Sequence, residues 1–195
     1  MKRLSSVLWC LSLLVVPMAA HAQATAWAGF AAGMSVPLGS FAHRADRAVD
    51  LGLSYVYPIG ESWSAGVDLY NHQWGGKGLV PRPDQVVGNV AVDNYRVSQV
   101  SALLYWVPDL RGTVQPYLRV GPGFYQLRTS YVANAFPSET ADHFGVLAGG
   151  GLVFRLQERV GLSTDAVFHH VLARDNRSAM DAVSLTAGLI LRFGL

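Results

Sequence analysis

The chain has 195 residues, of which 51% are hydrophobic and only 14% charged, and its formal net charge is +2. A balance this close to neutral excludes the strongly basic surface on which nucleic-acid binding depends. A single cysteine excludes a disulfide framework.

The first 22 residues have the pattern of a signal peptide. Lys2 and Arg3 form its positive start, and residues 7–20 form an apolar run that is too short for a comfortable membrane span. Residues 20–22 read Ala-His-Ala, a small-residue cleavage site. The sequence therefore predicts a signal peptide at residues 1–22 and one domain at residues 23–195.

Cys10 lies inside this apolar run, behind Leu8 and Trp9, and we interpret it as an ordinary signal-peptide residue and not as a site of lipid attachment. Removing 22 of 195 residues leaves a mature chain of 173, with no cysteine. Lys2 and Arg3 leave with the signal peptide, so 15 − 2 = 13 basic side chains face 13 acidic ones. No later apolar run reaches the length of a transmembrane helix. A half-hydrophobic exported chain of this kind is expected to be a soluble barrel, a sandwich or a membrane barrel.

From residue 27 onward, apolar side chains alternate with small or polar ones, which is typical of strands that have two unlike faces. The first three strands are predicted at residues 27–36, 49–57 and 62–72. Pro37 and Gly39 end the first strand, and a tight turn at residues 58–61 separates the second from the third.

The longest irregular segment, residues 73–94, is rich in glycine, proline and aspartate. A fourth strand is predicted at residues 95–107 and a fifth at residues 114–127. The fifth contains Pro116 and Pro122, and proline cannot donate a hydrogen bond to a strand ladder. We interpret Pro122 as a bulge or bend.

A second long loop is predicted at residues 128–142, and a very short turn at Gln157 and Glu158. The remaining strands are predicted at residues 144–155, 159–169 and 182–195. The last one alternates strictly, with apolar side chains at Val183, Leu185, Ala187, Leu189, Leu191 and Phe193. The positions between them hold mostly glycine, hydroxyl side chains and one arginine, which suit a crowded lumen better than open water.

The eight predicted strands recur every ten to twelve residues or so, about the spacing of membrane-spanning strands. Their connections alternate between short and long. Short turns at one rim and long loops at the other are typical of an eight-stranded antiparallel up-and-down transmembrane β-barrel, with both termini at the periplasmic rim.

The placement of charge favours lipid outside this barrel. A soluble barrel keeps its charges on the outer face, whereas here they share a face with the glycines, opposite the aliphatic side chains. Closing a narrow barrel crowds its interior, so small residues and the charges beside them are expected to point inward. Because buried charges must be paired, we predict an ion network in the lumen, formed by Asp68, Arg119, Arg155, Asp165 and Arg192. A structural plug is the favoured interpretation, and a gated pore is the alternative.

Aromatic side chains gather near the predicted periplasmic ends of the strands, on the outward face. A membrane barrel carries such a girdle at each interface. The predicted girdle residues are Tyr57, Trp63, Trp106, Phe154 and Phe193.

Residues 33–41, Gly-Met-Ser-Val-Pro-Leu-Gly-Ser-Phe, resemble the first strand and loop of the OmpA-type and opacity-type outer-membrane β-barrels. Residues 149–156, and 159–162 with Asp165, are similar to the paired sixth and seventh strands of that family. Phe193 resembles the terminal aromatic signal that the barrel-assembly machinery reads. The resemblance spans the mature chain and implies a single-domain barrel in a Gram-negative outer membrane, in contact with its lipids and lipopolysaccharide, without a cofactor.

His169 and His170 end the seventh predicted strand at the outer rim, where an eight-stranded lipid A deacylase carries a His/Ser/Glu triad. In that family a serine follows two residues after the histidine, and here that position is Val171. The alternation turns His169 inward and His170 outward. We favour rim histidines without a catalytic role, and a deacylase-like enzyme is the alternative.

His72 and His143 lie near aspartates, but no spacing matches a metal site. No catalytic, metal-binding or cofactor-binding residue is predicted. The loops at residues 73–94 and 128–142 are the expected seats of any surface ligand, because loops carry recognition on a rigid scaffold. The expected role is structural or surface-interactive, in adhesion or envelope integrity, and a narrow small-solute channel is a further alternative.

Overall fold

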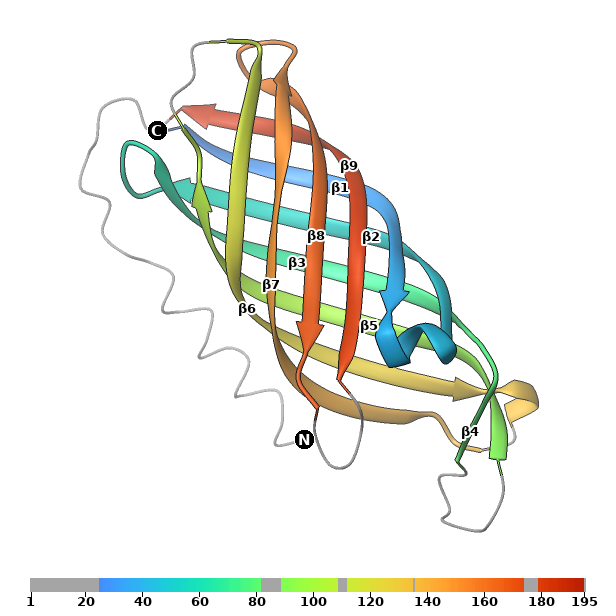
Figure 1. Cartoon of the computed structure of the whole chain (residues 1–195). Helices are drawn as coiled ribbons and strands as arrows, with labels where there is room; N and C mark the ends of the chain where they lie inside the picture. The colour runs from blue at the N-terminus through green and yellow to red at the C-terminus, as the bar shows by residue number, and fades with distance from the viewer. Residues whose placement is uncertain (1–24, 82–88, 109–111, 135, 174–178, 195) are drawn as a thin grey trace, which may run out of the picture.

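The protein folds into a β-barrel whose strands wind around one axis (Figure 1). The computed structural model describes residues 25–81, 89–108, 112–134, 136–173 and 179–194. Its strands are β1 (Thr25–Leu38), β2 (Ala45–Pro58), β3 (Trp63–Gly76), β4 (Leu79–Pro81), β5 (Asn89–Trp106), β6 (Val114–Tyr131), β7 (Glu139–Arg155), β8 (Val160–Val171) and β9 (Met180–Gly194). Two short 3-10 segments, η2 (Gly39–His43) and η3 (Val132–Asn134), lie between strands.

Eight of these strands close the barrel. Each pairs antiparallel with the next, β3 pairs directly with β5, and β1 pairs with β9 from Thr25 opposite Gly194 to Leu38 opposite Asp181. The short β4 pairs with β5 alone, outside the closed ring. Closure leaves no unpaired strand edge in the ring. The predicted eight-stranded antiparallel up-and-down barrel is confirmed.

The alternation of the sequence decides which side chains face outward. In β9, Leu185 and Leu189 are 55% and 47% exposed, whereas Ser184 and Thr186 are 2% and 6% exposed. The same pattern holds around the barrel, so that the aliphatic rows form the outer surface and Asp68, Arg119 and Asp165 are buried inside. The predicted orientation of the two faces is therefore confirmed.

Several strands run further than the sequence predicted. The segment 73–94 was expected to be irregular, but β3 continues to Gly76, β4 follows, and β5 begins at Asn89. Likewise β6 continues to Tyr131 and β7 begins at Glu139, which leaves residues 132–138 of the predicted loop 128–142 outside the two strands. The reason is that pairing with a neighbouring strand supplies backbone hydrogen bonds even where the side chains are polar and show no alternation of hydrophobicity.

Pro122 does not form a bulge, which corrects one of the two alternatives, bulge or bend, that the sequence predicted there. The register between β5 and β6 is the same on both sides of it, with Ser101 opposite Gly123 and Leu104 opposite Val120. Only the bridges between these two pairs are missing, because proline has no N–H to donate. The irregularity of this strand pair lies between Val92 and Asn94 instead.

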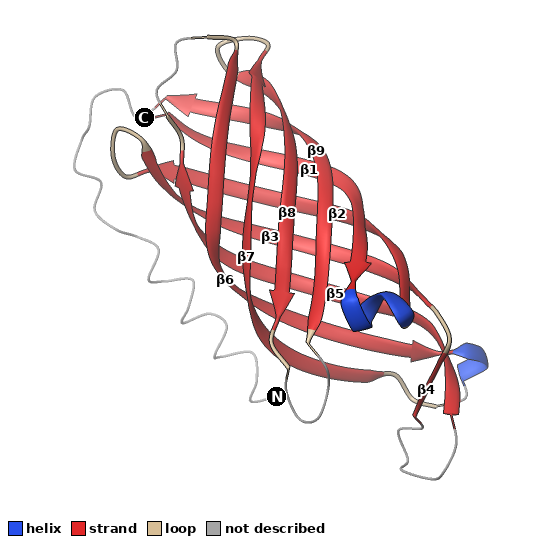
Figure 2. Cartoon of the chain, viewed as in Figure 1, coloured by secondary structure: helices blue, strands red, loops and turns tan. Residues whose placement is uncertain are grey.

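The two ends of the barrel differ. Turns at residues 59–62 and 156–159 join strands at what we call the short-turn end, where β5 and β9 also end and β6 begins. The opposite, long-loop end carries β4 and the two 3-10 segments, which Figure 2 shows in blue. Gly39 begins η2 with a φ of 55°, a left-handed conformation that glycine adopts without strain.

The predicted signal peptide, residues 1–22, lies outside the described residues. Among the residues that are described, no helix is both long enough and apolar enough to cross a membrane.

Candidate functional site

The interior of the barrel is the candidate site, because buried polar side chains concentrate there. Large interior side chains fit because glycines lie beside them on adjoining strands. A Cβ on Gly52 would stand 2.4 Å from the ring of Tyr70, and one on Gly151 would stand 2.8 Å from the hydroxyl of Tyr117. The glycine-rich inward face is thus the complement of the tyrosines that fill the lumen.

An arginine cluster occupies the middle of the interior. We define it as Asp68, Tyr105, Tyr117, Arg119 and Asp165. Arg119 Nη1 donates to Asp68 Oδ2 at 2.6 Å, and its Nη2 lies 3.3 Å from Asp165 Oδ1. Tyr105 donates to Asp68 at 3.1 Å, and Tyr117 donates to Asp165. Side chains from β3, β5, β6 and β8 therefore meet at one guanidinium group across the lumen.

The arginine cluster is buried and closely packed. All five members are buried, and the apolar side chains of Val56, Leu103, Leu147 and Val167 pack around its two tyrosines. A cavity of about 10 Å³ lies beside Arg119, which is room for about one water molecule. Charges so far from solvent are stable only when they are paired and hydrogen-bonded. The aspartates pair with both Nη atoms of Arg119, while its Nε has no hydrogen-bond partner among the described residues.

The other two predicted network residues lie elsewhere. Arg155 ends β7 and Arg192 lies near the end of β9, both at the short-turn end. Arg155 Nη2 donates to Gln115 Oε1 at 2.8 Å. Within the described part of the chain, neither Arg155 nor Arg192 forms an ion pair with a carboxylate. The structure thus brings three of the five predicted charges together and leaves two apart.

A second polar group, the histidine cluster, lies above the arginine cluster toward the long-loop end. It consists of Ser35, Asp50, His72, His169 and Ser184. His72 Nδ1 lies 2.8 Å from Asp50 Oδ1, Ser35 contacts both Asp50 and Ser184, and His169 Nε2 lies 3.1 Å from Ser184 Oγ. The two imidazole rings stand edge to face with centroids 5.4 Å apart.

Further hydrogen bonds join the histidine cluster to the surrounding strands. His72 Nε2 lies 3.0 Å from Gln99 Oε1, and Gln99 donates to Ser101 at 2.8 Å. Tyr125 hydrogen-bonds His169 Nδ1 at 3.3 Å. The ring nitrogens of both histidines are therefore satisfied inside the barrel.

His169 faces inward, as the alternation predicted, but it is 7% exposed and belongs to the buried lumen, which corrects its interpretation as a rim residue. Val171 indeed follows it where a deacylase has serine, but Ser184 on the neighbouring strand β9 supplies a hydroxyl at 3.1 Å. A Ser–His pair is the geometry of an activated nucleophile, yet Ser184 is only 2% exposed. His170 faces outward, as predicted, and its Nδ1 lies 2.6 Å from Asp181.

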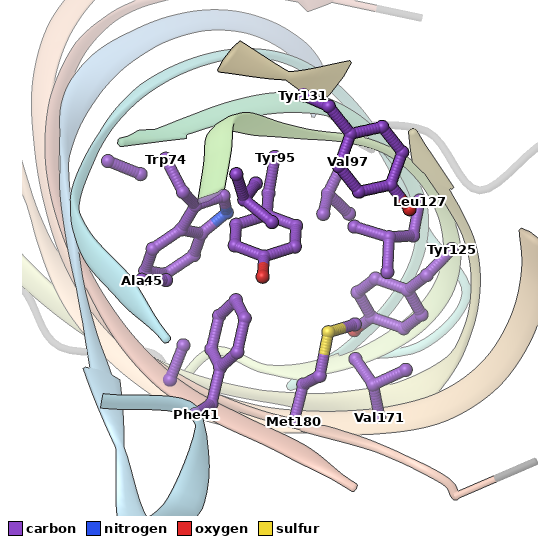
Figure 3. Packing of buried hydrophobic residues seen from close by; sticks show 13 residues of the cluster. Phe41, Ala45, Trp74, Tyr95, Val97, Tyr125, Leu127, Tyr131, Val171 and Met180 are labelled. Atoms are coloured by element: carbon purple, nitrogen blue, oxygen red, sulfur yellow. The ribbon is translucent and has the colours of Figure 1, made fainter. Parts of the chain in front are cut away.

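An apolar plug fills the interior at the long-loop end. Phe41 of η2 turns into the barrel, and its ring packs edge-on against Trp74 at 5.3 Å and Tyr95 at 5.8 Å. Figure 3 shows these side chains pointing from the surrounding ribbons toward the barrel axis. The plug comprises Phe41, Ala45, Ala48, Trp74, Val92, Tyr95, Val97, Tyr125, Leu127, Tyr131, Val171, Met180 and Ala182.

The sequence reasoning missed the apolar plug and the histidine cluster. The signal for the plug was present, since Val97 and Leu127 occupy inward positions where the lower parts of the same strands carry polar residues. The histidine cluster had no local signal, because its members come from β1, β2, β3, β8 and β9.

The remaining predicted residues are placed as follows. His143 is buried, and neither of its ring nitrogens has a hydrogen-bond partner among the described residues. Within the same residues, no group of three or more potential metal ligands lies close enough together to hold an ion. Trp63 and Trp106 face each other across β3 and β5 and are 47% and 40% exposed. Tyr57, Phe154 and Phe193 also lie at strand ends on the short-turn side.

On β3, β5, β6 and β7 the outward-facing side chains change from apolar to polar between one row and the next toward the long-loop end. An exposed apolar row is formed by Leu69, Val100, Phe124 and Phe144, in directly opposed positions on these strands. The next outward row toward the long-loop end is polar throughout, namely Asn71, Ser98, Gln126 and Asp142. Asn71 donates to Ser98 at 3.3 Å, and Gln126 donates to Asp142 at 3.1 Å.

An outer arginine pair, Arg96 and Arg128, lies in the row beyond. The two residues are directly opposite each other on β5 and β6, and both are exposed. Like charges at opposed positions are unfavourable. Neither arginine forms an ion pair with a carboxylate in the ranges that the structure describes.

The chain matches known proteins in family and in fold. The family model of the outer membrane protein beta-barrel domain matches residues 8–193. No curated protein sequence matches the chain. Neisserial surface protein A aligns with 87% of this chain and 97% of its own, with a TM-score of 0.59 and 15% identity.

Two further solved structures show the same barrel. The N-terminal barrel of Pseudomonas aeruginosa OprF covers 87% of this chain and 97% of its own, with a TM-score of 0.55 and 12% identity. Ail, the attachment invasion locus protein of Yersinia pestis, covers 89% of this chain and 100% of its own, with a TM-score of 0.51 and 16% identity.

Proposed function

The chain belongs to the outer membrane protein β-barrel family, and from this premise we propose that it is a closed, non-catalytic barrel with a structural or surface-interaction role in the outer membrane. The short-turn end then faces the periplasm, and the long-loop end faces the outside of the cell. The aromatic residues predicted as a girdle lie at the periplasmic interface in this orientation, where amphipathic rings are favoured.

The observation that carries this proposal is the filled interior. Arg119 joins Asp68 on β3 to Asp165 on β8 across the lumen, and the apolar plug covers the extracellular side. An eight-stranded barrel is just wide enough for its side chains to fill. A hydrated ion crossing the lumen would have to break both the arginine cluster and the plug.

Electrical recording from planar bilayers tests closure. The purified protein is first shown to be folded by its heat-modifiable migration on a gel. We expect the folded barrel to leave the membrane current at its baseline. Stable unit steps of reproducible size would contradict closure and favour the small-solute channel instead.

The non-catalytic part of the proposal rests on the burial of the histidine cluster. Ser35 and Ser184 are 0% and 2% exposed, so a lipid acyl chain does not reach either hydroxyl. The mass of lipid A from cells with and without the protein is expected to be the same. If lipid A lost an acyl chain only in cells that make the protein, the result would contradict the proposal and favour the deacylase alternative.

Lipopolysaccharide is the proposed lipid partner on the extracellular side. The outer arginine pair, Arg96 and Arg128, lies two rows beyond the exposed aromatic residues Phe124 and Phe144, at the height of headgroups. Arginine binds phosphate bidentately, and lipid A phosphates would relieve the repulsion between the two side chains.

The double substitution Arg96→Gln and Arg128→Gln tests this contact. Near a membrane surface a basic side chain contributes about 1 kcal/mol, so the affinity for lipopolysaccharide is expected to fall roughly fivefold per arginine. Arg47→Gln, an exposed arginine on β2, is the matched control. Equal affinities for the double variant and the control would contradict the assignment.

A surface ligand would meet the extracellular extension formed by β4 and the upper parts of β5 and β6. This extension lies within the segments 73–94 and 128–142 that were predicted to carry recognition. Shortening residues 77–88 to a tight turn is expected to abolish adhesion of expressing cells while leaving heat-modifiable migration intact. Unchanged adhesion would place the surface role elsewhere.

Export and assembly complete the proposal. Residues 1–22 are a signal peptide, so the intact mass of the membrane-extracted protein is expected to correspond to a chain that starts at Gln23. Phe193, exposed near the end of β9, is the proposed signal to the barrel-assembly machinery. A protein that retains residues 1–22 in the membrane would contradict the first point.

A further inference from the structure

The periplasmic mouth of the barrel holds a basin that the closed interior does not use. Its volume is about 460 Å³, and it is lined by Arg155, Leu156, Gln157, Glu158 and Arg192. Arg155 ends β7 and Arg192 lies on β9, so the turn between β7 and β8 forms one wall. We call this space the periplasmic basin. It is far larger than the cavity beside Arg119.

The two arginines of the periplasmic basin have no ion-pair partner among the residues that the structure describes. Arg155 and Arg192 are close enough to repel each other. Glu158 lines the same basin but does not lie within ion-pair distance of either guanidinium group.

Arg155 also presents a donor that lacks an acceptor. Its Nη2 is bound to Gln115 Oε1 at 2.8 Å, while its Nε is buried without a hydrogen-bond partner in the described part of the chain. A buried donor left unsatisfied costs about 1–3 kcal/mol. An acceptor that enters from the periplasm would remove this cost.

The donor set indicates the chemistry of the missing acceptor. Each guanidinium group is planar and can donate two parallel N–H hydrogen bonds to two oxygen atoms of one phosphate group. A free phosphate ion carries up to two negative charges, so it can match both arginines at once. A phosphodiester headgroup carries one charge, as a carboxylate does, but its two free oxygens can each accept from a different guanidinium group.

We propose that the periplasmic basin is a phosphate-binding site formed by Arg155 and Arg192, open to the periplasm. The phosphate is either free in solution or carried by a phospholipid headgroup of the inner leaflet. The site does not depend on whether the lumen conducts, because it lies on the periplasmic side of the arginine cluster.

The test is an NMR titration of the full mature chain, observing the arginine Nε–Hε signals. In a maltoside detergent, which carries no phosphate, inorganic phosphate is added at constant ionic strength. We expect the Arg155 and Arg192 signals to shift and saturate while the Arg119 signal stays in place. Chloride at the same ionic strength is expected to leave all three unchanged.

Variants link the shifts to the residues. Arg155→Gln and Arg192→Gln are each expected to weaken phosphate binding about tenfold or more, the effect of losing a charge-assisted hydrogen bond. Arg159→Gln removes one charge from the same turn without touching the basin wall and is expected to bind as the wild type does. Heat-modifiable migration shows that each variant is folded.

A second arm distinguishes the two sources of phosphate. The protein is placed in nanodiscs that contain phosphatidylglycerol, with no free phosphate. Shifts of Arg155 and Arg192 in this arm identify a lipid headgroup as the ligand, and shifts only with inorganic phosphate identify a soluble one. The proposal is overturned if neither arm shifts these signals, if chloride shifts them equally, or if the two basin variants bind phosphate as Arg159→Gln does.

Discussion

Two groups of arginines face the inside of this barrel, and they differ in their partners. Arg119, at mid-height, contacts Asp68 at 2.6 Å and Asp165 at 3.3 Å and is buried. Arg155 and Arg192, at the short-turn mouth, contact no carboxylate of the described residues and line an open basin. The alternation of side chains along a strand decides whether an arginine faces the lumen or the lipid. The carboxylates within reach of that arginine then decide whether it links strands through ion pairs or stays available to bind a ligand.

The largest effect is expected when the partnered arginine is removed. Arg119→Gln leaves Asp68 and Asp165 buried without their counter-charge, and breaking a buried ion pair in this way costs about 3–5 kcal/mol. The free energy of unfolding in urea, measured in lipid vesicles, checks the prediction. A loss below about 1 kcal/mol would mean that the aspartates find water, and that the interior is not dry.

A substitution in the apolar plug shows whether the arginine cluster or the plug keeps the lumen closed to ions. Phe41→Ala removes the ring that packs on Trp74 and Tyr95, and a buried Phe→Ala substitution costs about 3 kcal/mol or more. The arginine cluster is untouched, so the bilayer current is expected to stay at baseline although stability falls. Unit current steps in this variant would show that the plug, and not the arginine cluster, closes the lumen.

A smaller effect is expected from crowding the arginine cluster. A Cβ on Gly151 would stand 2.1 Å from the backbone oxygen of Thr164 and 2.8 Å from the hydroxyl of Tyr117. Overpacking of this kind costs about 1–3 kcal/mol, which is expected for Gly151→Ala in the same urea assay. Gly112→Ala is the control, because the nearest described atom beyond its chain neighbours would stand 4.0 Å from the new Cβ. Equal stabilities of the two variants would argue against close packing of Tyr117.

The smallest effect is expected at the mouth. Arg192→Gln breaks no ion pair in the described chain, and it removes a charge that repels Arg155. The free energy of unfolding is expected to stay within about 0.5 kcal/mol of the wild type, as for surface substitutions. A loss comparable to that of Arg119→Gln would place Arg192 in the structural group and erase the difference between the two groups.

The sequence alone predicts which face of a strand each side chain occupies, but not which side chains of different strands meet. Alternation predicted the outward face of Leu185 and Leu189 and the inward face of Asp68 and Arg119, because side chains change sides at every step of a strand. It did not show that Ser184 lies beside His169, because that contact depends on the register between two strands, which no local pattern records.

Other differences have the same origin. The strands continue through the polar segments 73–76 and 128–131 because neighbouring strands satisfy their backbone. Phe41 reaches the interior because η2 folds back over the long-loop mouth, a tertiary contact of a short 3-10 segment. Arg155 and Arg192 face inward like Arg119, and only their heights in the barrel separate them from the two aspartates.

Exchange of the arginine Nε–H protons with solvent, measured by NMR on the folded wild-type protein, tests the difference between the two groups most directly. We expect the proton of Arg119 to be strongly protected and that of Arg192 to exchange quickly, because Arg119 is buried whereas Arg192 lines the open mouth. Exchange of Arg119 as fast as that of Arg192 would show a hydrated, open lumen and would contradict the closed barrel.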